Sequence, residues 1–576
     1  MSAKRAKPKK KKSFVRSFLF ALGGSLIALL VISLFVDFNP RWQEPQILKS
    51  QNGFLDVTLN AATSKVSIGG KMQESPVYNN KYINDTWEVK GGDTINVHLK
   101  NNLTDPTNLH FHGSHVSPKG NSDNVLLNIK PGETFDYSYK LPKNHPPGLY
   151  WYHPHLHTFT DEQVMGGMVG AIIVKGDVDE LPGIKGLPEK RLVLTTQDVG
   201  NATNRLVNNQ VDPTLYVRPF ETVRLEILNA SADDFYNFAI PGQKLNIISR
   251  DGNTLSHVDS VDSEVMAPGD RIQILFKAGL WKTYNVTSLS YNAGSFTYPE
   301  DAFMKIKVAG IPVLPHGLPT KLEPHEDFRN AHIDNVRTLT FTEGGTSANP
   351  TYLLDGKEFD PNVVNQIITL GTTEEWRLVN NSVDTHPFHI HINPFQVISA
   401  NGVPVDRYGY DDTFPVPAHS NVVIRTKYQD FDGKYVLHCH ILFHEDHGMM
   451  QVVEVVKPGN DVSSDNGMPD REGMPGMEAM HNTSGVEGMG MGEEKQIMVA
   501  AQKNVVDNTI NGIHVNVVFG KQIGEYAIVR AVPLHNETDP LQIILQKVRG
   551  KWKVIDSGTA FPNLEGKVPS GLFSTP

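Results

Sequence analysis

Apolar and polar residues alternate over short stretches through most of the chain between residues 45 and 457. Segments 94–99 and 423–426 alternate or are rich in β-branched residues, and Gly, Pro, Asn and Asp interrupt the pattern at short intervals. Successive side chains of a strand point to opposite faces, so this pattern predicts strands with one buried face. No long stretch in this region has the 3.6-residue period of a helix. The pattern therefore predicts an all-β fold.

Two proline-rich or polar breaks, near residues 176–189 and 310–335, divide this β-rich region into three blocks. Blocks of roughly 120–140 residues are typical of Greek-key β-sandwiches, and three in series suit a repeat of one sandwich type. We therefore expect three sandwich domains, over residues 45–178, 188–310 and 336–457.

The N-terminus has a different pattern. Residues 1–17 form a basic tail, and residues 18–36 contain no charge. A helix of that length covers roughly 28 Å, close to the thickness of a bilayer's hydrocarbon core. No small-residue cleavage site follows, so we expect a single-pass signal-anchor at the cell membrane rather than a cleaved signal peptide. The basic tail would stay cytoplasmic and the body would be extracytoplasmic, either periplasmic or extracellular. A cleaved signal peptide, the alternative, would also export the body.

After residue 457 the composition changes. Residues 458–494 are rich in Gly and hold six of the fifteen methionines, which indicates a linker. Because thioethers bind Cu(I), the alternatives are Cu(I) delivery or sensing and a plain flexible linker. Residues 495–576 regain a strand pattern, in which segments 541–548 and 552–555 flank a turn and predict a hairpin. We expect a small C-terminal α+β domain that serves as an interaction or wall-facing module. It contains no cluster of potential ligands.

Composition and charge narrow the chemistry. The chain has 576 residues, and residues 1–16 hold eight Lys and Arg and no acid. The remaining 45 Lys and Arg face 63 Asp and Glu, so the body carries about −18 and is not expected to bind nucleic acid. The single cysteine, Cys439, excludes an intramolecular disulfide framework, a CxxC redox pair, a zinc finger and a cysteine-ligated iron–sulfur cluster. Histidine, with 23 copies, is the abundant potential ligand.

Four short segments gather histidines in the pattern His-x-His. They are 110–113 (HFHG), 153–155 (HPH), 386–391 (HPFHIH) and 438–444 (HCHILFH). Residues i and i+2 of a strand share a face, so each pair presents two imidazoles side by side. Four pairs supply eight imidazoles, enough to hold several metal ions at one place.

Cys439 lies between two histidines of the last segment and must point to the opposite face of that strand. A thiolate with two imidazoles and a weak axial thioether is the ligand set of a blue-copper electron-transfer site. The residues in reach are His386, His444 and Met449. Zinc is redox-inert, so a zinc site would not explain a thiolate and a thioether beside the imidazoles. The Glu-x-x-His pattern of carboxylate-bridged iron is absent from the sequence. The sequence therefore predicts copper, with a covalent path from Cys439 to a multi-metal site.

With these motifs the chain resembles the three-domain multicopper oxidases, among them laccases, bilirubin oxidase, and bacterial cuprous-oxidase and spore-coat laccase relatives. The resemblance covers about residues 45–457 and extends to the linking segments 148–152 (GLYWY), 267–271 (APGDR) and 375–376 (EW). It implies three cupredoxin-like Greek-key β-sandwich domains and four copper ions. It also implies one-electron oxidation of a substrate at a type 1 copper and four-electron reduction of dioxygen to water at a trinuclear cluster.

The resemblance assigns a role to each ligand. It implies that the type 1 copper is held by His386, Cys439 and His444, with Met449 axial, and the type 2 copper by His110 and His389. It implies that the paired type 3 coppers are held by His112, His153, His155, His391, His438 and His440. Glu445 matches a carboxylate that relays protons in the family. Asp123 resembles a second acidic residue of this kind, although its spacing from the first histidine pair is about two residues longer.

Several functions remain open at this point. The main hypothesis is a membrane-anchored, laccase-like oxidase with a phenolic or aromatic reductant. The closest alternative is a metallo-oxidase for Cu(I), Fe(II) or Mn(II) in copper tolerance or metal homeostasis, because the enzyme class does not determine the substrate. A copper-storing or electron-carrying protein would bind copper without reducing dioxygen. A copper nitrite reductase resembles a two-domain chain and would lack the paired histidines that flank Cys439.

Overall fold

The computed structural model describes residues 42–198, 203–346, 349–459, 515–523, 525–533, 541–548 and 551–558. Within these ranges nearly all regular structure is strand, as the alternating pattern predicts. The helices there are α2 (Thr160–Met165) and α3 (Leu442–Asp446), with 3-10 turns η1 (Asp177–Glu180) and η2 (Phe328–Asn330). None of these described helices has the length and apolar character needed to cross a bilayer. The predicted membrane anchor and the Met-rich linker lie outside the described residues.

The first sandwich holds the first two histidine segments. One sheet has the order β1 (Ile47–Lys49), β4 (Thr86–Lys90), β9 (Gly170–Lys175), β8 (Gly148–His153) and β6 (His110–His112). The other has the order β3 (Lys71–Tyr78), β2 (Phe54–Ile68), β5 (Thr94–Asn101) and β7 (Thr134–Lys140). Buried and exposed residues alternate along the first half of β2, because one face of this strand packs on the core. Trp87 and Tyr152 stack in that core with ring centroids 3.8 Å apart.

The second sandwich contains none of the four histidine segments. Its larger sheet has the order β12 (Gln210–Val211), β11 (Thr203–Val207), β10 (Glu189–Asp198), β14 (Thr222–Asn229), β19 (Arg271–Lys277), β16 (Leu245–Arg250) and β17 (Asn253–Val261). Its smaller sheet has the order β13 (Thr214–Val217), β23 (Asp301–Val308), β20 (Thr283–Leu289), β15 (Tyr236–Ala239) and β18 (Ser263–Met266), and β21 (Tyr291–Asn292) pairs with β22 (Thr297–Tyr298). Leu225, Phe238 and Ile274 are buried in its core.

The third sandwich holds the other two histidine segments on neighbouring strands. One sheet has the order β25 (Asn349–Leu354), β24 (Asn335–Thr346), β27 (Thr373–Asn380), β32 (Ser420–Lys427), β29 (Phe395–Ala400) and β30 (Val403–Pro404). The other has the order β26 (Val364–Thr369), β34 (Met450–Val456), β33 (Gly433–Cys439), β28 (His386–Ile390) and β31 (Thr413–Val416). Trp376 is fully buried in the core of this sandwich.

The described part of the C-terminal region is a four-stranded antiparallel sheet. Its order is β35 (Val515–Ile523), β36 (Tyr526–Pro533), β37 (Leu541–Val548) and β38 (Lys551–Gly558). The predicted hairpin is therefore confirmed, with its second strand starting one residue earlier and ending three residues later than expected. The described residues of this region form no regular structure other than strands, and the rest of the expected α+β domain lies outside the described residues.

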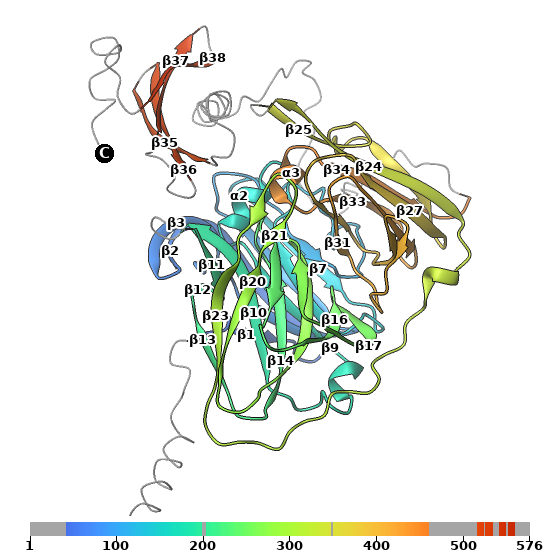
Figure 1. Cartoon of the computed structure of the whole chain (residues 1–576). Coiled ribbons are helices and arrows are strands. Elements are labelled where there is room, and N and C mark those ends of the chain that lie inside the picture. Colours follow the sequence, from blue (N-terminus) through green and yellow to red (C-terminus); the bar gives the residue numbers. More distant parts are fainter. Residues whose placement is uncertain are drawn as a thin grey trace, which may run out of the picture.

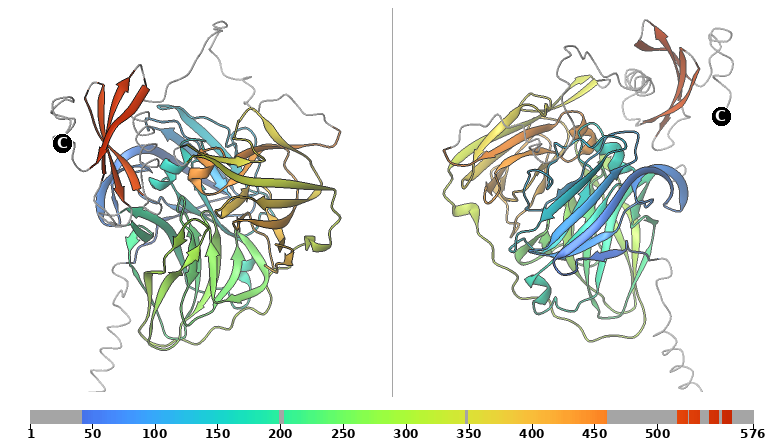
Figure 2. Two further views of the ribbon diagram at one scale, coloured as in Figure 1. Left: turned by 45° about the horizontal axis from the view of Figure 1, so that its top comes forward. Right: turned by 180° about the vertical axis from the view of Figure 1, so that it is seen from behind.

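The three sandwiches group around a common centre instead of forming a row (Figure 1, Figure 2). The first and third meet directly, because the Asp446 carboxylate at the end of α3 accepts the backbone N–H groups of Thr158 (2.7 Å) and Asp161 (2.8 Å) beside α2. The second contributes Arg271, whose guanidinium donates to Asp412 of the third sandwich at 2.5 and 2.8 Å. These contacts place the histidine strands of the first and third sandwiches side by side.

Candidate metal centres

Strands β6 and β8 present the histidines of the first sandwich. They pair antiparallel with His110 opposite His153, and the alternation of the strand puts His110 and His112 on one face, with ring centroids 5.6 Å apart. His155 follows β8, where its backbone N–H donates to the side-chain oxygen of Asn108 at 2.6 Å. These four imidazoles are almost completely shielded from solvent, although histidine side chains are usually at least partly exposed.

Strands β28 and β33 present the histidines of the third sandwich. They pair antiparallel with His389 opposite His438. The next residues of the same faces are His391 and His440, so both His-x-His pairs project toward the first sandwich. There, the Nε2 atoms of His155, His391 and His438 converge at 3.0, 3.2 and 3.3 Å from one another. Three imidazole nitrogens from two sandwiches thus surround one point.

The other imidazoles of this cluster also converge. His440 Nε2 lies 3.1 Å from His112 Nδ1, and the ring of His110 stacks on that of His391 with centroids 3.8 Å apart. Groups of three whose ligand atoms all lie within 4.8 Å of one another include His110, His112 and His153, and also His110, His389 and His391. The structure therefore brings together all eight imidazoles of the four predicted pairs.

The donor set fits metal ions. Several buried ring nitrogens have no hydrogen-bond partner: His110 Nε2, His153 Nε2, His389 Nε2, His391 Nδ1 and His440 Nδ1. A buried polar atom without a partner is costly, so such a concentration requires an explanation. Burial also lowers the pKa of His110, His112 and His438 well below the ordinary value, which keeps these rings neutral. Neutral imidazole is the form that binds metal.

A second group lies on the opposite face of β33. Cys439 Sγ is 3.4 Å from His386 Nδ1 and 3.7 Å from His444 Nδ1, and these two nitrogens are 3.2 Å apart. The backbone N–H of Cys439 donates to the carbonyl of Met449 at 3.0 Å, and both side chains are fully buried in the same core. Burial raises the pKa of the Cys439 thiol well above its usual value. This site therefore favours a thiolate only when a cation is bound beside it.

The two predicted carboxylates lie against different histidines of the eight-imidazole cluster. Glu445 oxygens are 3.0 Å from His438 Nδ1 and 3.4 Å from His155 Nδ1. Asp123 lies 3.0 Å from His110 Nδ1 and accepts the backbone N–H of Phe111 at 2.9 Å. Burial raises the pKa of both carboxyls, to about 8 for Asp123.

The longer spacing before Asp123 is absorbed by a compact loop. The backbone N–H of Asp123 donates to the carbonyl of Ser117 at 3.0 Å, and that of Ser122 donates to Lys119 at 3.1 Å. These turns fold the extra residues outward and return the carboxylate to β6. The spacing alone did not reveal this, because loop length does not determine where a loop returns.

A third carboxylate beside this cluster was not expected from the sequence. One Asp412 oxygen lies 3.2 Å from His112 Nε2, and the Asp412 carbonyl lies 2.8 Å from His389 Nδ1. Burial alone would raise the pKa of Asp412, but the guanidinium of Arg271 lowers it below the ordinary value. In the sequence, the only hint of this contact is the segment APGDR (267–271), which contains Arg271. In the structure this segment passes close to the cluster, because a Cβ at Gly269 would lie 3.0 Å from the His440 ring.

The hairpin β24–β25 contributes further unexpected residues near Cys439. Glu343 Oε1 lies 3.2 Å from His386 Nε2, which also lies 2.7 Å from the hydroxyl of Ser382. The Tyr352 ring stacks on His444 with centroids 4.0 Å apart. No motif marks these residues, because their relation to the site arises from the fold of the hairpin and not from local spacing.

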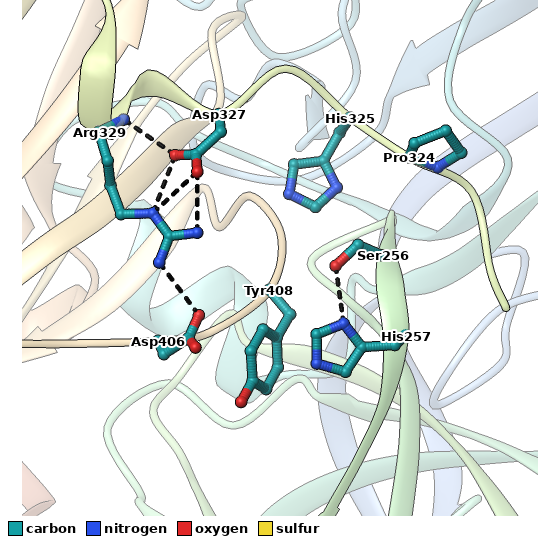
Figure 3. A pocket seen from close by; sticks show the side chains of 8 residues that line it. All are labelled: Ser256, His257, Pro324, His325, Asp327, Arg329, Asp406 and Tyr408. Carbon is teal, nitrogen blue, oxygen red and sulfur yellow. Dashed lines mark hydrogen bonds and ion pairs between the residues drawn. The ribbon is translucent and has the colours of Figure 1, made fainter. Parts of the chain in front are cut away.

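A separate pocket lies between β17, the connection after the second sandwich and the loop before β31. It has a volume of about 390 Å³ and is lined by Ser256, His257, Pro324, His325, Asp327, Arg329, Asp406 and Tyr408 (Figure 3). Arg329 pairs with Asp327 at 2.8 Å and with Asp406 at 3.4 Å, so its single positive charge is shared between two carboxylates. Within the described ranges, the groups that could hold a metal include none of these residues.

Buried histidine clusters joined through one cysteine define a copper-binding redox protein with two kinds of metal centre. Sequence comparison agrees, because residues 60–179, 188–297 and 330–459 each match a family profile described as multicopper oxidase. The chain therefore belongs to the multicopper oxidase family. It is a copper-dependent oxidoreductase that uses dioxygen, and the family binds four coppers.

Individual relatives cover the same part of the chain. The multicopper oxidase mco of Staphylococcus aureus is 27% identical over 442 residues, which are 73% of this chain and 92% of the relative. The laccase of Bacillus subtilis is 26% identical, over 74% of this chain and 100% of the laccase. A solved structure described as a multicopper oxidase from Campylobacter jejuni, a metallo-oxidase, aligns with a TM-score of 0.62 at 25% identity, over 74% of this chain and all of that one. The activity is accordingly laccase-like: substrate oxidation coupled to reduction of dioxygen to water.

Proposed function

We propose that the two faces of β33 divide this reaction between two copper centres, with Cys439 as the connection. His386, Cys439, His444 and Met449 would hold the type 1 copper. This proposal rests on how β33 orients its side chains. The thiol sulfur of Cys439 lies near two imidazole nitrogens on one face of the strand, while His438 and His440 project from the other face.

The eight remaining imidazoles would hold a trinuclear copper cluster between the first and third sandwiches. The type 2 copper would take His110 and His389, whose Nε2 atoms have no partner. The paired type 3 coppers would take the other imidazoles: His112, His153, His155, His391, His438 and His440. When bound, these coppers supply the one-electron steps and the binding of dioxygen.

Electrons would enter at the face that reaches solvent. His444 is 9% exposed, whereas His386 and Cys439 are fully buried. The Tyr352 ring covers His444, so an aromatic reductant could stack at this edge. We propose a phenolic or aromatic reductant on this basis. Cys439 is joined by peptide bonds to His438 and His440, whose imidazoles belong to the cluster. Electrons could therefore pass from the sulfur to the cluster along covalent bonds.

Reduction of dioxygen to water also needs protons at a buried site. Glu445 contacts two imidazoles on one side of the cluster, and Asp123 contacts His110. Their raised pKa values keep a proton on each carboxyl at a higher pH than on an exposed acid. We assign them to proton delivery, with Glu445 next to the type 3 ligands and Asp123 next to a type 2 ligand.

A metal ion is the second candidate reductant, and one contact favours it. Glu343 places a carboxylate 3.2 Å from His386, beside the proposed type 1 site. Its Oε1 accepts no hydrogen bond, so it offers an oxygen ligand to Fe(II) or Mn(II), and its negative charge also attracts Cu(I).

We also propose that the chain is held at the cell membrane by residues 18–36, with the N-terminus cytoplasmic and the oxidase extracytoplasmic. Support for this comes from the uncharged stretch and the basic residues before it.

The division between two centres is tested by replacing the connecting thiol. In detergent-solubilised full-length protein, we expect four coppers per chain and oxygen uptake with a phenol. Cys439→Ser should lose the blue absorption and one copper, and oxygen uptake should fall to background, because the thiolate is both ligand and electron path. One or two coppers in the wild-type protein, or retained turnover in the variant, would overturn the proposal.

The variant also needs a control for general damage. His447→Ala changes an exposed residue of the same turn, whose Nδ1 lies 2.7 Å from the Phe443 carbonyl. We expect this variant to keep its copper, its colour and most of its activity. Loss of colour in both variants would show that the turn is fragile and that the cysteine result is not specific.

A further inference from the structure

We propose that one end of the second sandwich docks on the surface of an anionic lipid bilayer. This end, named the domain-2 tip, consists of residues 218–221 between β13 and β14, residues 278–282 between β19 and β20, and residues 309–315 after β23. The inference rests on the membrane anchor proposed above and goes beyond it, because it states which surface of the folded body meets the lipid.

The three segments of the domain-2 tip form one continuous surface. The backbone N–H of Phe220 donates to the carbonyl of Gly279 at 3.3 Å, and the indole N–H of Trp281 donates to the carbonyl of Gly310, also at 3.3 Å. The backbone N–H of Val313 donates to the carbonyl of Pro219 at 3.0 Å. In Figure 1, the long connection that follows β23 leaves from the lower end of the green second sandwich, where this surface lies.

Large apolar side chains of the domain-2 tip face solvent. The exposed fractions are 38% for Phe220, 52% for Leu280, 64% for Trp281 and 90% for Leu314. Single exposed apolar residues are common, but four on adjoining turns form a patch that marks an interaction site. Phe220 also has φ +66, a left-handed conformation that is unfavourable for a residue other than glycine. Glycine would adopt this conformation more readily, so the backbone alone does not account for an aromatic residue here.

The charge around this patch is positive. Lys277, Lys282 and Lys307 lie at the ends of β19, β20 and β23, and all three are exposed. Among the described residues none of them forms an ion pair, whereas Arg218 is paired with Glu221 at 2.8 Å. Lysines near an anionic bilayer are attracted to its surface, and an exposed Trp beside basic residues is typical of the membrane interface. This combination is notable in a body that is acidic overall.

The beginning of the described chain lies within reach of this end. Glu44 accepts a hydrogen bond from Lys190 at 2.8 Å, and Lys190 pairs with Leu225 three residues from the first residue of β14. At the rise of a strand, Leu225 lies about 10 Å from the first residue of β14, which borders the domain-2 tip. The uncharged stretch ends at residue 36, and residues 37–41 reach at most about 18 Å when extended. A body tethered so closely holds this end of the second sandwich near the lipid.

The test measures lipid contact at single sites of the full-length, copper-loaded protein. The native thiol of Cys439 is fully buried, so an introduced cysteine can be labelled alone with an environment-sensitive nitrobenzoxadiazole dye. The tip variant is Leu314→Cys. The matched control is Val403→Cys, an exposed apolar position of β30 in the third sandwich (66% exposed). Both proteins are reconstituted into vesicles of phosphatidylcholine and phosphatidylglycerol, with and without spin-labelled lipid as quencher.

We expect the spin-labelled lipid to quench the dye at position 314 several-fold more than at position 403. Without phosphatidylglycerol the difference should shrink, because the lysines lose their anionic partner. Equal quenching at the two positions in protein that floats with the vesicles would overturn docking while the anchor stands. Protein that does not float would overturn both the anchor and docking. Quenching that is unaffected by phosphatidylglycerol would overturn the requirement for anionic lipid.

Discussion

At the scale of single residues, Glu445 is positioned to act on protons and not on copper. It follows His444 in the sequence, yet its carboxylate lies on the other side of α3, near His438 and His155. The helical turn explains this, since consecutive residues of a helix point in directions about 100° apart. One short turn therefore serves both centres.

We predict that Glu445→Gln lowers kcat for dioxygen reduction about 100-fold, because it removes a group that delivers protons by general acid catalysis. Burial raises the pKa of Glu445, so the wild-type kcat should decline as the pH rises through that pKa and the carboxyl loses its proton. The variant should lack this part of the pH profile. The measurement is oxygen uptake over a pH series at saturating phenol.

The control for this variant is the type 1 colour. Blue absorption and copper content should equal those of the wild type, since Gln keeps the shape of Glu, and Glu445→Asp should restore part of the rate. A variant with normal copper and an unchanged pH profile would show that Glu445 does not deliver protons.

The ligands and their neighbours differ in how far the sequence could reveal them. Metal ligands on strands obey a fixed spacing, so the sequence alone is enough to identify the four His-x-His pairs. Asp412 and Glu343 could not be identified in this way, because Glu343 lies on β24 and Asp412 lies directly before β31, outside the His-x-His segments. Asp123 had an ambiguous spacing, and only the folded loop shows that it lies at His110.

At the scale of elements, β33 and the hairpin β24–β25 have different parts in the site. The two faces of β33 followed directly from strand alternation. In the sequence the hairpin shows only the usual strand pattern. Its position beside the site depends on the parallel pairing of β24 with β27, which the pattern does not predict. It brings Tyr352 onto His444 and Glu343 onto His386, so we expect it to influence the choice of reductant.

We predict that Glu343→Gln lowers kcat/KM for Cu(I), Fe(II) or Mn(II) about tenfold, the factor that corresponds to about 1.4 kcal/mol. The variant loses the negative charge that attracts a cation but keeps the shape of the side chain. A neutral phenol should be oxidised at nearly the wild-type rate. The measurement compares oxygen uptake with each metal ion and with the phenol.

Glu375→Gln is the matched control, because Glu375 is a partly buried carboxylate of the same sandwich that pairs with Arg425 at 2.9 Å. Glu375→Gln should leave kcat/KM unchanged for the metal ions and for the phenol. If the metal ions and the phenol decline together in Glu343→Gln, the carboxylate acts on the type 1 histidine and not on the reductant.

At the scale of the whole molecule, Arg271 joins the three sandwiches at the cluster. It belongs to β19 of the second, its Nε donates to the Leu149 carbonyl of the first at 3.3 Å, and its terminal nitrogens donate to Asp412 of the third. Three sandwiches in series could be predicted from the sequence. Their grouping could not, because the contacts that determine it join residues more than 100 positions apart.

Replacing this arginine therefore tests the assembly. We predict that Arg271→Gln destabilises the protein by about 3–5 kcal/mol, the usual cost of leaving a buried charge without its partner. Arg271 holds the pKa of Asp412 below its ordinary value, so in the wild type this carboxylate stays charged and stabilising until the pH falls well below the ordinary range. In the variant, burial without the guanidinium should raise that pKa. The carboxyl can then take up a proton as the pH falls, so the stability deficit should be largest near neutral pH and shrink toward acid.

The copper content of the cluster should also change when Arg271 is replaced. Asp412 contacts His112 and, through its carbonyl, His389, so Arg271→Gln should lose copper from the trinuclear centre while the blue type 1 absorption persists. Arg224→Gln is the control, because Arg224 is also buried but pairs with Asp179 at 2.5 Å and with Glu189 at 3.6 Å, at the start of the second sandwich. It should lower the melting temperature without selective loss of copper. If the two variants lose the same copper, or if the deficit of Arg271→Gln grows toward acid pH, then Arg271 does not maintain the charge of Asp412, and another contact must hold the sandwiches together at the cluster.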